Sequence, residues 1–189
     1  MPLPMRRPDL LSVLAVLGGI AYPFVVYVAL PYLPPGALVA LALGLGALHL
    51  LHRPATSVIP RWAFVLIPVV LLILLGAHPL LAAQAYPPLV SLSLAAAFAW
   101  SLAFPPSAIE RLARLTRPDL PPAGVAYTRT VTKVWTVFFL ANAAIAILSA
   151  LFLPVALWAL WTGLISYLCI GLLFGGELLL RRAILRPQP

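Results

Sequence analysis

Long apolar runs alternate with short polar breaks along most of this 189-residue chain. Six of the runs approach the length of about 20 residues that a membrane-crossing helix needs. They cover residues 10–30, 36–52, 62–78, 87–104, 131–152 and 156–180. The pattern therefore predicts an all-α integral membrane protein, in which residues 1–189 form a single membrane domain built as a six-transmembrane-helix bundle.

Proline clusters lie at several of the breaks between these runs. The clusters are "PYLPP" at residues 31–35, "YPP" at 86–88 and "PP" at 105–106. Proline lacks a backbone N–H and interrupts helices, so we expect helices to end at these clusters. Pro23 and Pro68 fall inside apolar runs, where we expect them to bend the helix.

Composition supports the membrane class. The chain is 63% hydrophobic and only 8% charged, and its mean hydropathy is +1.09. A soluble domain of this size cannot bury so much apolar surface. The formal net charge of +8 would suggest nucleic acid as the partner of a soluble protein. Here the basic residues flank apolar runs, so we predict anionic lipid as a partner and no nucleic acid.

The basic residues all fall in alternate breaks, on one side of the predicted bundle. They lie before the first run, between the second and third, between the fourth and the start of the fifth, and after the sixth. Loops rich in Lys and Arg stay in the cytoplasm. We therefore predict a multi-pass protein with its N-terminus and C-terminus in the cytoplasm.

The longest polar stretch, residues 105–135, holds seven of the sixteen charged side chains. Ser107 and Glu110 form an S-x-x-E capping box, which predicts the start of a short helix. Pro118 is expected to end that helix, and a second helix is expected to begin near Val125. The pattern thus places a short cytoplasmic amphipathic helix between the fourth and fifth spans, within a loop over residues 105–130.

This helix and the next carry the basic side chains that form the first candidate site. These residues are Arg111, Arg114, Arg117, Arg129 and Lys133. Ile109 and Leu112 share the opposite, apolar face, which we expect to rest on the membrane. Two interpretations stay open: the cations anchor the helix to anionic headgroups of the inner leaflet, or they dock an acidic partner.

A few polar side chains in or beside the apolar runs form a second candidate site: Glu177, Asn142, His49 and His52. Glu177 lies one turn before Arg181, so it either pairs with that arginine at the interface or belongs to an intramembrane site. Asn142 is expected to find a partner inside the bundle. His49 and His52 share a helix face, but no third ligand is near in sequence, so we predict no metal and no cofactor.

Two further patterns concern helix packing and depth in the membrane. Gly171 and Gly175 form a G-x-x-x-G motif, which allows close packing of helices. Tryptophans are common at membrane interfaces, so we expect Trp135 at the inner interface and Trp158 at the outer one.

Motifs of common enzyme classes are missing from the sequence. It contains no P-loop, no HExxH and no GxSxG, whose residue types and spacing carry phosphate binding, metal-assisted hydrolysis and nucleophilic catalysis. The single cysteine, Cys169, cannot form an internal disulfide. The missing motifs favour a non-enzymatic role.

Three segments resemble a known family: "YPFVVY" at residues 22–27, "IERLARLTRPDLPPAGVAYTRTVTKVWTVFF" at 109–139 and "LWALWTGLISYLCIGLLFGGELLLRR" at 157–182. They are similar to an uncharacterised bacterial inner-membrane protein family, whose members are often encoded among genes for aryl-polyene and related fatty-acid-like lipid biosynthesis. The chain departs from the family at Thr162, where members tend to have Asn. The resemblance implies a bacterial inner-membrane location and a pathway that uses acidic acyl carrier proteins, but no particular reaction.

Three functions follow from these observations. The first is a non-enzymatic accessory component that recruits or organises acyl-carrier-linked lipid biosynthesis or export machinery through its basic loop. The second is a subunit of a lipid or small-molecule transporter or flippase, which the prolines inside apolar runs and Glu177 permit. The third is an intramembrane acyl or glycosyl transferase, for which Glu177, Asn142, His49 and His52 would be the available polar groups.

Overall fold

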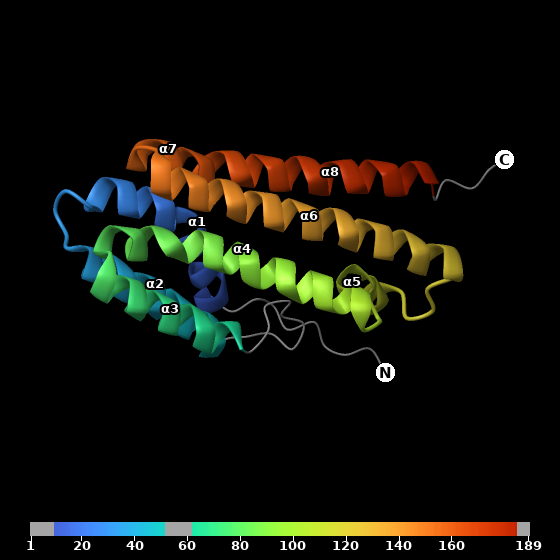
Figure 1. Ribbon diagram of the computed structural model, residues 1–189. Helices are drawn as coiled ribbons and strands as arrows, with labels where there is room; N and C mark the ends of the chain where they lie inside the picture. Colours follow the sequence, from blue (N-terminus) through green and yellow to red (C-terminus); the bar gives the residue numbers. More distant parts are fainter. Residues whose placement is uncertain (1–9, 52–61, 185–189) are drawn as a thin grey trace.

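In the computed structural model, the described residues form helices and no strands (Figure 1). The structure describes residues 10–51 and 62–184, with their side chains except those of residues 10–16, 49, 63–64 and 180–184. The predicted all-α class is confirmed. The elements are α1 (Leu10–Ala29), α2 (Pro35–Leu51), α3 (Ala63–Ala77), α4 (Pro79–Ala103), α5 (Ala108–Thr116), α6 (Pro122–Phe152), α7 (Val155–Leu160), the π-helical turn η1 (Trp161–Ile165) and α8 (Ser166–Ile184).

Three long helices set the length of the molecule: α4, α6, and the continuous rod of α7, η1 and α8 (Figure 1). Each is long and apolar enough to cross a membrane, over Pro79–Ala103, Pro122–Phe152 and Val155–Leu179. This chain is therefore a membrane protein, as its composition predicts.

The predicted six-span bundle is wrong. Where side chains are described, the other apolar helical segments are shorter, at Leu17–Ala29, Pro35–Leu48 and Val65–Ala77. Helix α2 has 17 residues and α3 has 15, which corresponds to about 26 Å and 22 Å of rise. A hydrocarbon core is about 30 Å thick. At α2 and α3, hydropathy overcounted the spans because it measures how apolar a run is, whereas the helix ends decide how far the helix reaches.

The fourth predicted run is also corrected at its start. We predicted a span over residues 87–104 that begins after the "YPP" cluster, but α4 begins at Pro79 and contains both Pro87 and Pro88. Pro79 stands in the first turn of α4, where a missing N–H costs nothing because that group has no helical partner anyway. The helix thus starts at one proline and continues through two more.

A side chain from α1 compensates for the proline inside α4. Pro87 has no N–H to donate to the carbonyl of Ala83, four residues earlier. The Tyr22 hydroxyl donates to that carbonyl at 2.8 Å and also lies 3.2 Å from the carbonyl oxygen of Leu38. Tyr22 is fully buried, so one phenol joins α1, α2 and α4 and satisfies the carbonyl that Pro87 leaves without a donor.

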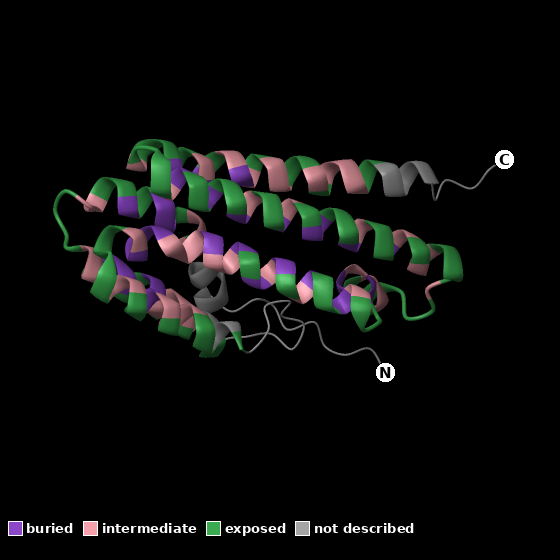
Figure 2. Cartoon of the chain, viewed as in Figure 1, coloured by how far each residue is buried: buried purple, intermediate pink, exposed green. Residues whose placement is uncertain are grey.

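Two apolar clusters hold the helices together. The first surrounds Tyr22 and Trp158 and joins α1, α2, α3, α4 and α7. The second, which we term the aromatic cluster, comprises Ala95, Phe98, Ala108, Trp135 and Phe139 of α4, α5 and α6. Figure 2 shows the complementary pattern, with exposed positions along the outer faces of α6 and α8.

These clusters correct the expectation for two tryptophans. Trp158 is 0% exposed and Trp135 is 9% exposed, so both belong to the interior rather than to a membrane interface. Trp135 stacks at a tilt against Phe139, with ring centroids 5.5 Å apart. Sequence context could not separate the two roles, because an indole near the end of an apolar run suits either environment.

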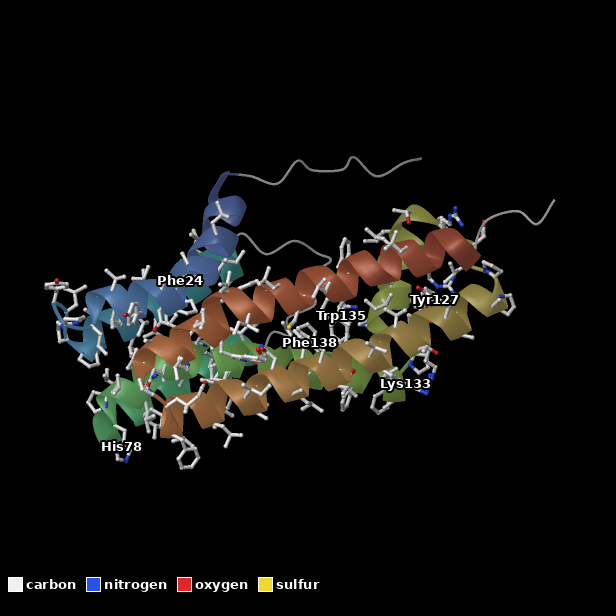
Figure 3. The ribbon with its side chains drawn as sticks, turned by 90° about the horizontal axis from the view of Figure 1, so that it is seen from above. Phe24, His78, Tyr127, Lys133, Trp135 and Phe138 are labelled. Atoms are coloured by element: carbon white, nitrogen blue, oxygen red, sulfur yellow. The ribbon has the colours of Figure 1, made fainter. Side chains whose placement is uncertain are left out.

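Gly163 lies in a close contact between helices, whereas the glycines of the predicted motif do not. A Cβ at Gly163 would lie 2.6 Å from the ring of Phe24 on α1, so a side chain there would have to displace that ring from the contact of α1 with η1 (Figure 3). At Gly171 and Gly175, a Cβ would meet nothing within 4 Å in the described chain. The predicted packing through G-x-x-x-G therefore does not occur between the described helices.

Candidate functional site

The first candidate site is the end of the molecule where α5 packs beside the first turns of α6 (Figure 1). We term residues 107–133, which comprise α5, the turn that follows it and the first turns of α6, the basic platform. The first N–H groups of a helix lack partners within it, and here three of them bond to oxygens from different elements. The bonds run from Ala108 N–H to Ser101 Oγ of α4 (2.9 Å), from Ile109 N–H to Thr132 Oγ1 of α6 (3.3 Å), and from Glu110 N–H to Ser107 Oγ (3.4 Å). Helix α5 is therefore fixed to both neighbours.

The predicted capping box is confirmed and has a further role. The Glu110 carboxylate accepts the Ser107 N–H at 3.4 Å, while the Ser107 hydroxyl accepts the Glu110 N–H. Arg114 donates to the same carboxylate from Nε at 2.9 Å and Nη2 at 2.8 Å, as the i,i+4 spacing predicts. Its Nη1 donates to the carbonyl of Pro118 at 2.9 Å. Arg114 thus joins the first turn of α5, through Glu110, to the backbone after the helix, through Pro118. It is a structural residue rather than a free cation.

The other four cations of the basic platform are exposed: Arg111, Arg117, Arg129 and Lys133. Arg111 donates from Nε to the carbonyl of Pro106 at 2.9 Å, which fixes its direction. Among the described residues, no carboxylate forms an ion pair with any of the four. Lys133 points away from the neighbouring helices in Figure 3. The basic platform therefore presents uncompensated positive charge from two helices.

The apolar face of α5 is divided between the protein and its surroundings. Ile109 packs against the aromatic cluster, whereas Leu112 is 38% exposed and Leu115 61% exposed. We had expected Ile109 and Leu112 to rest together on the membrane. Ile109 instead anchors α5 to the bundle, so only Leu112 and Leu115 are available to lipid.

Asn142, predicted to find a partner inside the bundle, has two. Its Nδ2 donates to Ser91 Oγ of α4 at 3.0 Å, and its Oδ1 accepts from Trp161 Nε1 of η1 at 3.1 Å. The amide therefore connects three elements, α4, α6 and η1. This arrangement confirms the prediction and gives Asn142 a structural role.

A cavity of about 580 Å³ lies beside this network. Its wall is formed by residues of α1, α2, α3, α4, α6, η1 and α8, and most of the lining is aliphatic. The polar side chains that line it are Tyr86, Ser91, Asn142, Thr162, Ser166 and Tyr167. Of the predicted intramembrane residues, the structure places Asn142 here.

Tyr86 was missed by the sequence reasoning, although the sequence carries a signal for it. The tripeptide Ala-Tyr-Pro occurs twice, at residues 21–23 and 85–87. The structure brings the two copies together, with the rings of Tyr22 and Tyr86 at a centroid distance of 5.0 Å and an edge-on angle of 61°. The repeat thus marks a contact between α1 and α4 next to the cavity.

The remaining predicted residues do not join the cavity in the described structure. Glu177 is partly buried on α8 and has no hydrogen-bond or ion-pair partner among the described residues. The side chains of Arg181 and His49 and the whole of His52 lie outside the described residues, so the pairing of Glu177 with Arg181 stays a prediction. Within the described ranges, no group of three His, Cys, Asp or Glu residues is placed to hold a metal ion.

Comparisons of this chain with protein-family models, curated proteins and solved structures found no match. The resemblance to a bacterial inner-membrane family therefore stays a prediction. Function has to be inferred from the chemistry of the basic platform and of the cavity.

Proposed function

We propose that this protein is a non-enzymatic accessory component of the bacterial inner membrane that holds an acidic acyl carrier protein at the cytoplasmic surface, for lipid biosynthesis or export. One observation carries the proposal: the basic platform presents four exposed cations from α5, the turn after it and α6, and α5 is bonded to both α4 and α6. Complementary charge of this kind speeds and orients the encounter with an acidic partner.

The anchoring of α5 supports a docking role because it leaves the cations preorganised. The N-terminal N–H groups of α5 are already bonded to Ser101, Thr132 and Ser107, so a partner's carboxylates meet side chains rather than the helix end. A surface that is ordered before binding loses less conformational entropy when the partner arrives. Arg114 contributes to this order rather than to binding, since its guanidinium is bonded to Glu110 and Pro118.

The small apolar footprint of α5 favours a protein partner over simple membrane anchoring. A helix that lies in the lipid interface needs a broad apolar face turned towards the lipid. Ile109 packs against the aromatic cluster, which leaves Leu112 and Leu115 for lipid. The cytoplasmic orientation is part of the proposal and follows from the positive-inside rule.

Charge substitution tests the docking role. We would replace Arg111, Arg117, Arg129 and Lys133 together by Gln, leave Arg114 in place, and reconstitute the full chain in nanodiscs of neutral lipid. Binding of a purified acyl carrier protein is then measured at about 0.1 M and about 1 M salt. At low salt we expect the Gln variant to bind at least about tenfold more weakly than the unchanged protein, since each exposed charge pair contributes up to about 1 kcal/mol.

A charge-conserving variant serves as the control. Arg111, Arg117 and Arg129 become Lys while Lys133 becomes Arg, and this protein should retain binding at low salt and lose it at high salt. Carrier binding by the Gln variant that equals that of the unchanged protein at both salts would refute the docking role. If none of the three proteins binds the carrier, and the Gln variant alone loses binding to anionic vesicles, the cations would instead be assigned to lipid headgroups.

A further inference from the structure

The cavity beside Asn142 has the size and position of a ligand site. Its volume of about 580 Å³ falls within the range of about 300–1,000 Å³ that is usual for small-molecule sites. Its wall includes the middle of α4, α6 and the η1–α8 rod, the three helices that are able to cross a membrane. Molecules that reach it therefore come from the hydrocarbon layer.

The described lining residues are uncharged, and most of them are aliphatic. A free carboxylate or phosphate that entered such a wall would lose its hydration without gaining a counter-ion. A hydrocarbon chain faces no such cost. However, it gains little hydrophobic free energy on leaving the bilayer, because lipid tails are as apolar as the cavity. Selectivity for one chain over bulk lipid must therefore come from polar groups in the wall.

Most of these polar groups already have partners within the protein. Asn142 is bonded to Ser91 and Trp161. The hydroxyl of Thr162 donates to the carbonyl of Trp158 at 2.8 Å, and that of Ser166 donates to the carbonyl of Thr162 at 3.0 Å. The phenol hydroxyls of Tyr86 and Tyr167 have no hydrogen-bond partner among the described residues. They are therefore available to a ligand as donors, as is the hydroxyl of Ser91, which accepts from Asn142 and donates to no described residue.

The wall also contains a rare backbone feature. Thr162 lies in the π-helical turn η1 and Ser166 follows it directly, and both are nearly fully buried. Single π-turns within α-helices are rare and occur frequently at functional sites. This one lies between α7 and α8, where it brings Trp161 to Asn142 and places Thr162 and Ser166 in the wall.

We propose that the cavity binds one acyl chain of a neutral, ester-linked lipid, whose ester group accepts hydrogen bonds from the phenols of Tyr86 and Tyr167. An ester fits both requirements of the wall, since its oxygens accept hydrogen bonds and it carries no charge. This inference does not depend on the basic platform and holds whether or not an acyl carrier protein docks there.

The test uses the full chain in nanodiscs and a photoreactive probe, the methyl ester of a palmitoyl chain that carries a diazirine and an alkyne. An alkane of equal length with the same two groups serves as the comparison probe. We expect the double variant Tyr86→Phe/Tyr167→Phe to reduce saturable labelling of cavity-lining peptides by the ester about three- to tenfold, which is the usual effect of losing one or two hydrogen bonds. Labelling by the alkane should change less than the labelling by the ester.

A pair of glycines on α2 provides a second test that keeps the phenols. A Cβ at Gly46 or at Gly44 would meet nothing within 4 Å, but only Gly46 lines the cavity. Gly46→Leu should therefore fill the cavity and reduce labelling by the ester several-fold, while Gly44→Leu makes the same change on the same helix and should leave labelling within about twofold, as expected for a surface substitution.

Two outcomes would overturn the proposal. Equal labelling of Gly46→Leu and Gly44→Leu would show that the probe does not occupy the cavity. Equal saturable labelling of the unchanged protein by ester and alkane would show that the phenols do not select an ester. Gel filtration of each variant before reconstitution confirms that it is folded. If the tyrosine variant is not folded, the glycine pair tests whether the probe occupies the cavity, and the comparison of ester with alkane on the unchanged protein tests selection of the ester.

Discussion

Two identical proline pairs in one stretch of the chain have opposite effects on its path. Pro87 and Pro88 lie inside α4, which continues for fifteen residues beyond them to Ala103, whereas Pro105 and Pro106 follow its end. By itself the dipeptide removes two N–H donors in either place. The difference must therefore come from what the surroundings offer to the carbonyl groups left without donors.

At the inner pair, the missing donor is replaced by a group from another helix. The hydroxyl of Tyr22 donates to the carbonyl of Ala83 at 2.8 Å, which is the position that the N–H of Pro87 would serve. The ring of Tyr22 also contacts that of Tyr86, directly before the proline pair. A contact 61 residues away in sequence thus replaces the donor that is missing at the first of the two prolines.

At the outer pair, local groups complete the break instead. The last turn of α4 closes with Phe104 N–H bonded to the carbonyl of Trp100 at 2.9 Å. Ser101 then accepts the N–H of Ala108 across the break, and Ser107 caps the next helix. The comparison teaches that a proline pair ends a helix where nearby side chains stabilise a new start, and is tolerated where a distant donor replaces the lost N–H.

The largest effect is expected from removing the distant donor. Tyr22→Phe keeps the ring but leaves the carbonyl of Ala83 buried without a partner, so we expect a loss of about 1–3 kcal/mol in the free energy of unfolding. Unfolding of the detergent-solubilised protein by a denaturing detergent measures it. Tyr27→Phe is the matched control, because Tyr27 lies on the same helix and is 49% exposed.

A double-mutant cycle separates this donor from general packing. Pro87→Ala restores an N–H that is able to bond to the carbonyl of Ala83, so Tyr22→Phe should be less destabilising in that background than in the unchanged chain. Strictly additive losses in the two backgrounds would show that the hydroxyl does not substitute for the missing N–H.

An intermediate effect is expected at the outer pair. Ser107→Ala removes the cap of α5 and should cost about 0.5–2 kcal/mol locally. Trypsin cleaves after arginine, so faster cleavage after Arg111 reports the opening of α5. Thr130→Ala, at an exposed position of α6, is the control. Cleavage at an unchanged rate would argue that Ser101 and Thr132 alone hold the start of α5.

The smallest effect is expected from the exposed charges of the basic platform. Arg117→Gln removes a side chain that has no ion-pair partner among the described residues, so stability should change by less than about 0.5 kcal/mol. The same unfolding assay measures this change. A loss as large as that of Ser107→Ala would mean that Arg117 stabilises the fold and is not free to bind a partner.

Local patterns predicted most of the helices and the start of the basic platform. The capping box of Ser107 and Glu110 was visible because its two residues lie three positions apart and its two hydrogen bonds join only these residues. The cations of the platform were also visible as a basic stretch between apolar runs. Of the two contacts of Arg114, the sequence predicted the pair with Glu110, because the two residues are four positions apart. It did not predict the bond to Pro118, which depends on how the chain turns after α5.

By itself, the sequence determined the membrane class, the all-helical content and the position of most breaks, because each depends on composition or on residues within a turn or two of one another. Only the tertiary structure decided how many helices are long enough to cross a membrane, that α4 passes through Pro87 and Pro88, and that Trp135 and Trp158 are buried. It also decided that Tyr86, Asn142 and Tyr167 line one cavity. The physical reason is the same in each case: burial and the replacement of a lost hydrogen bond depend on groups that are distant in sequence and adjacent in space.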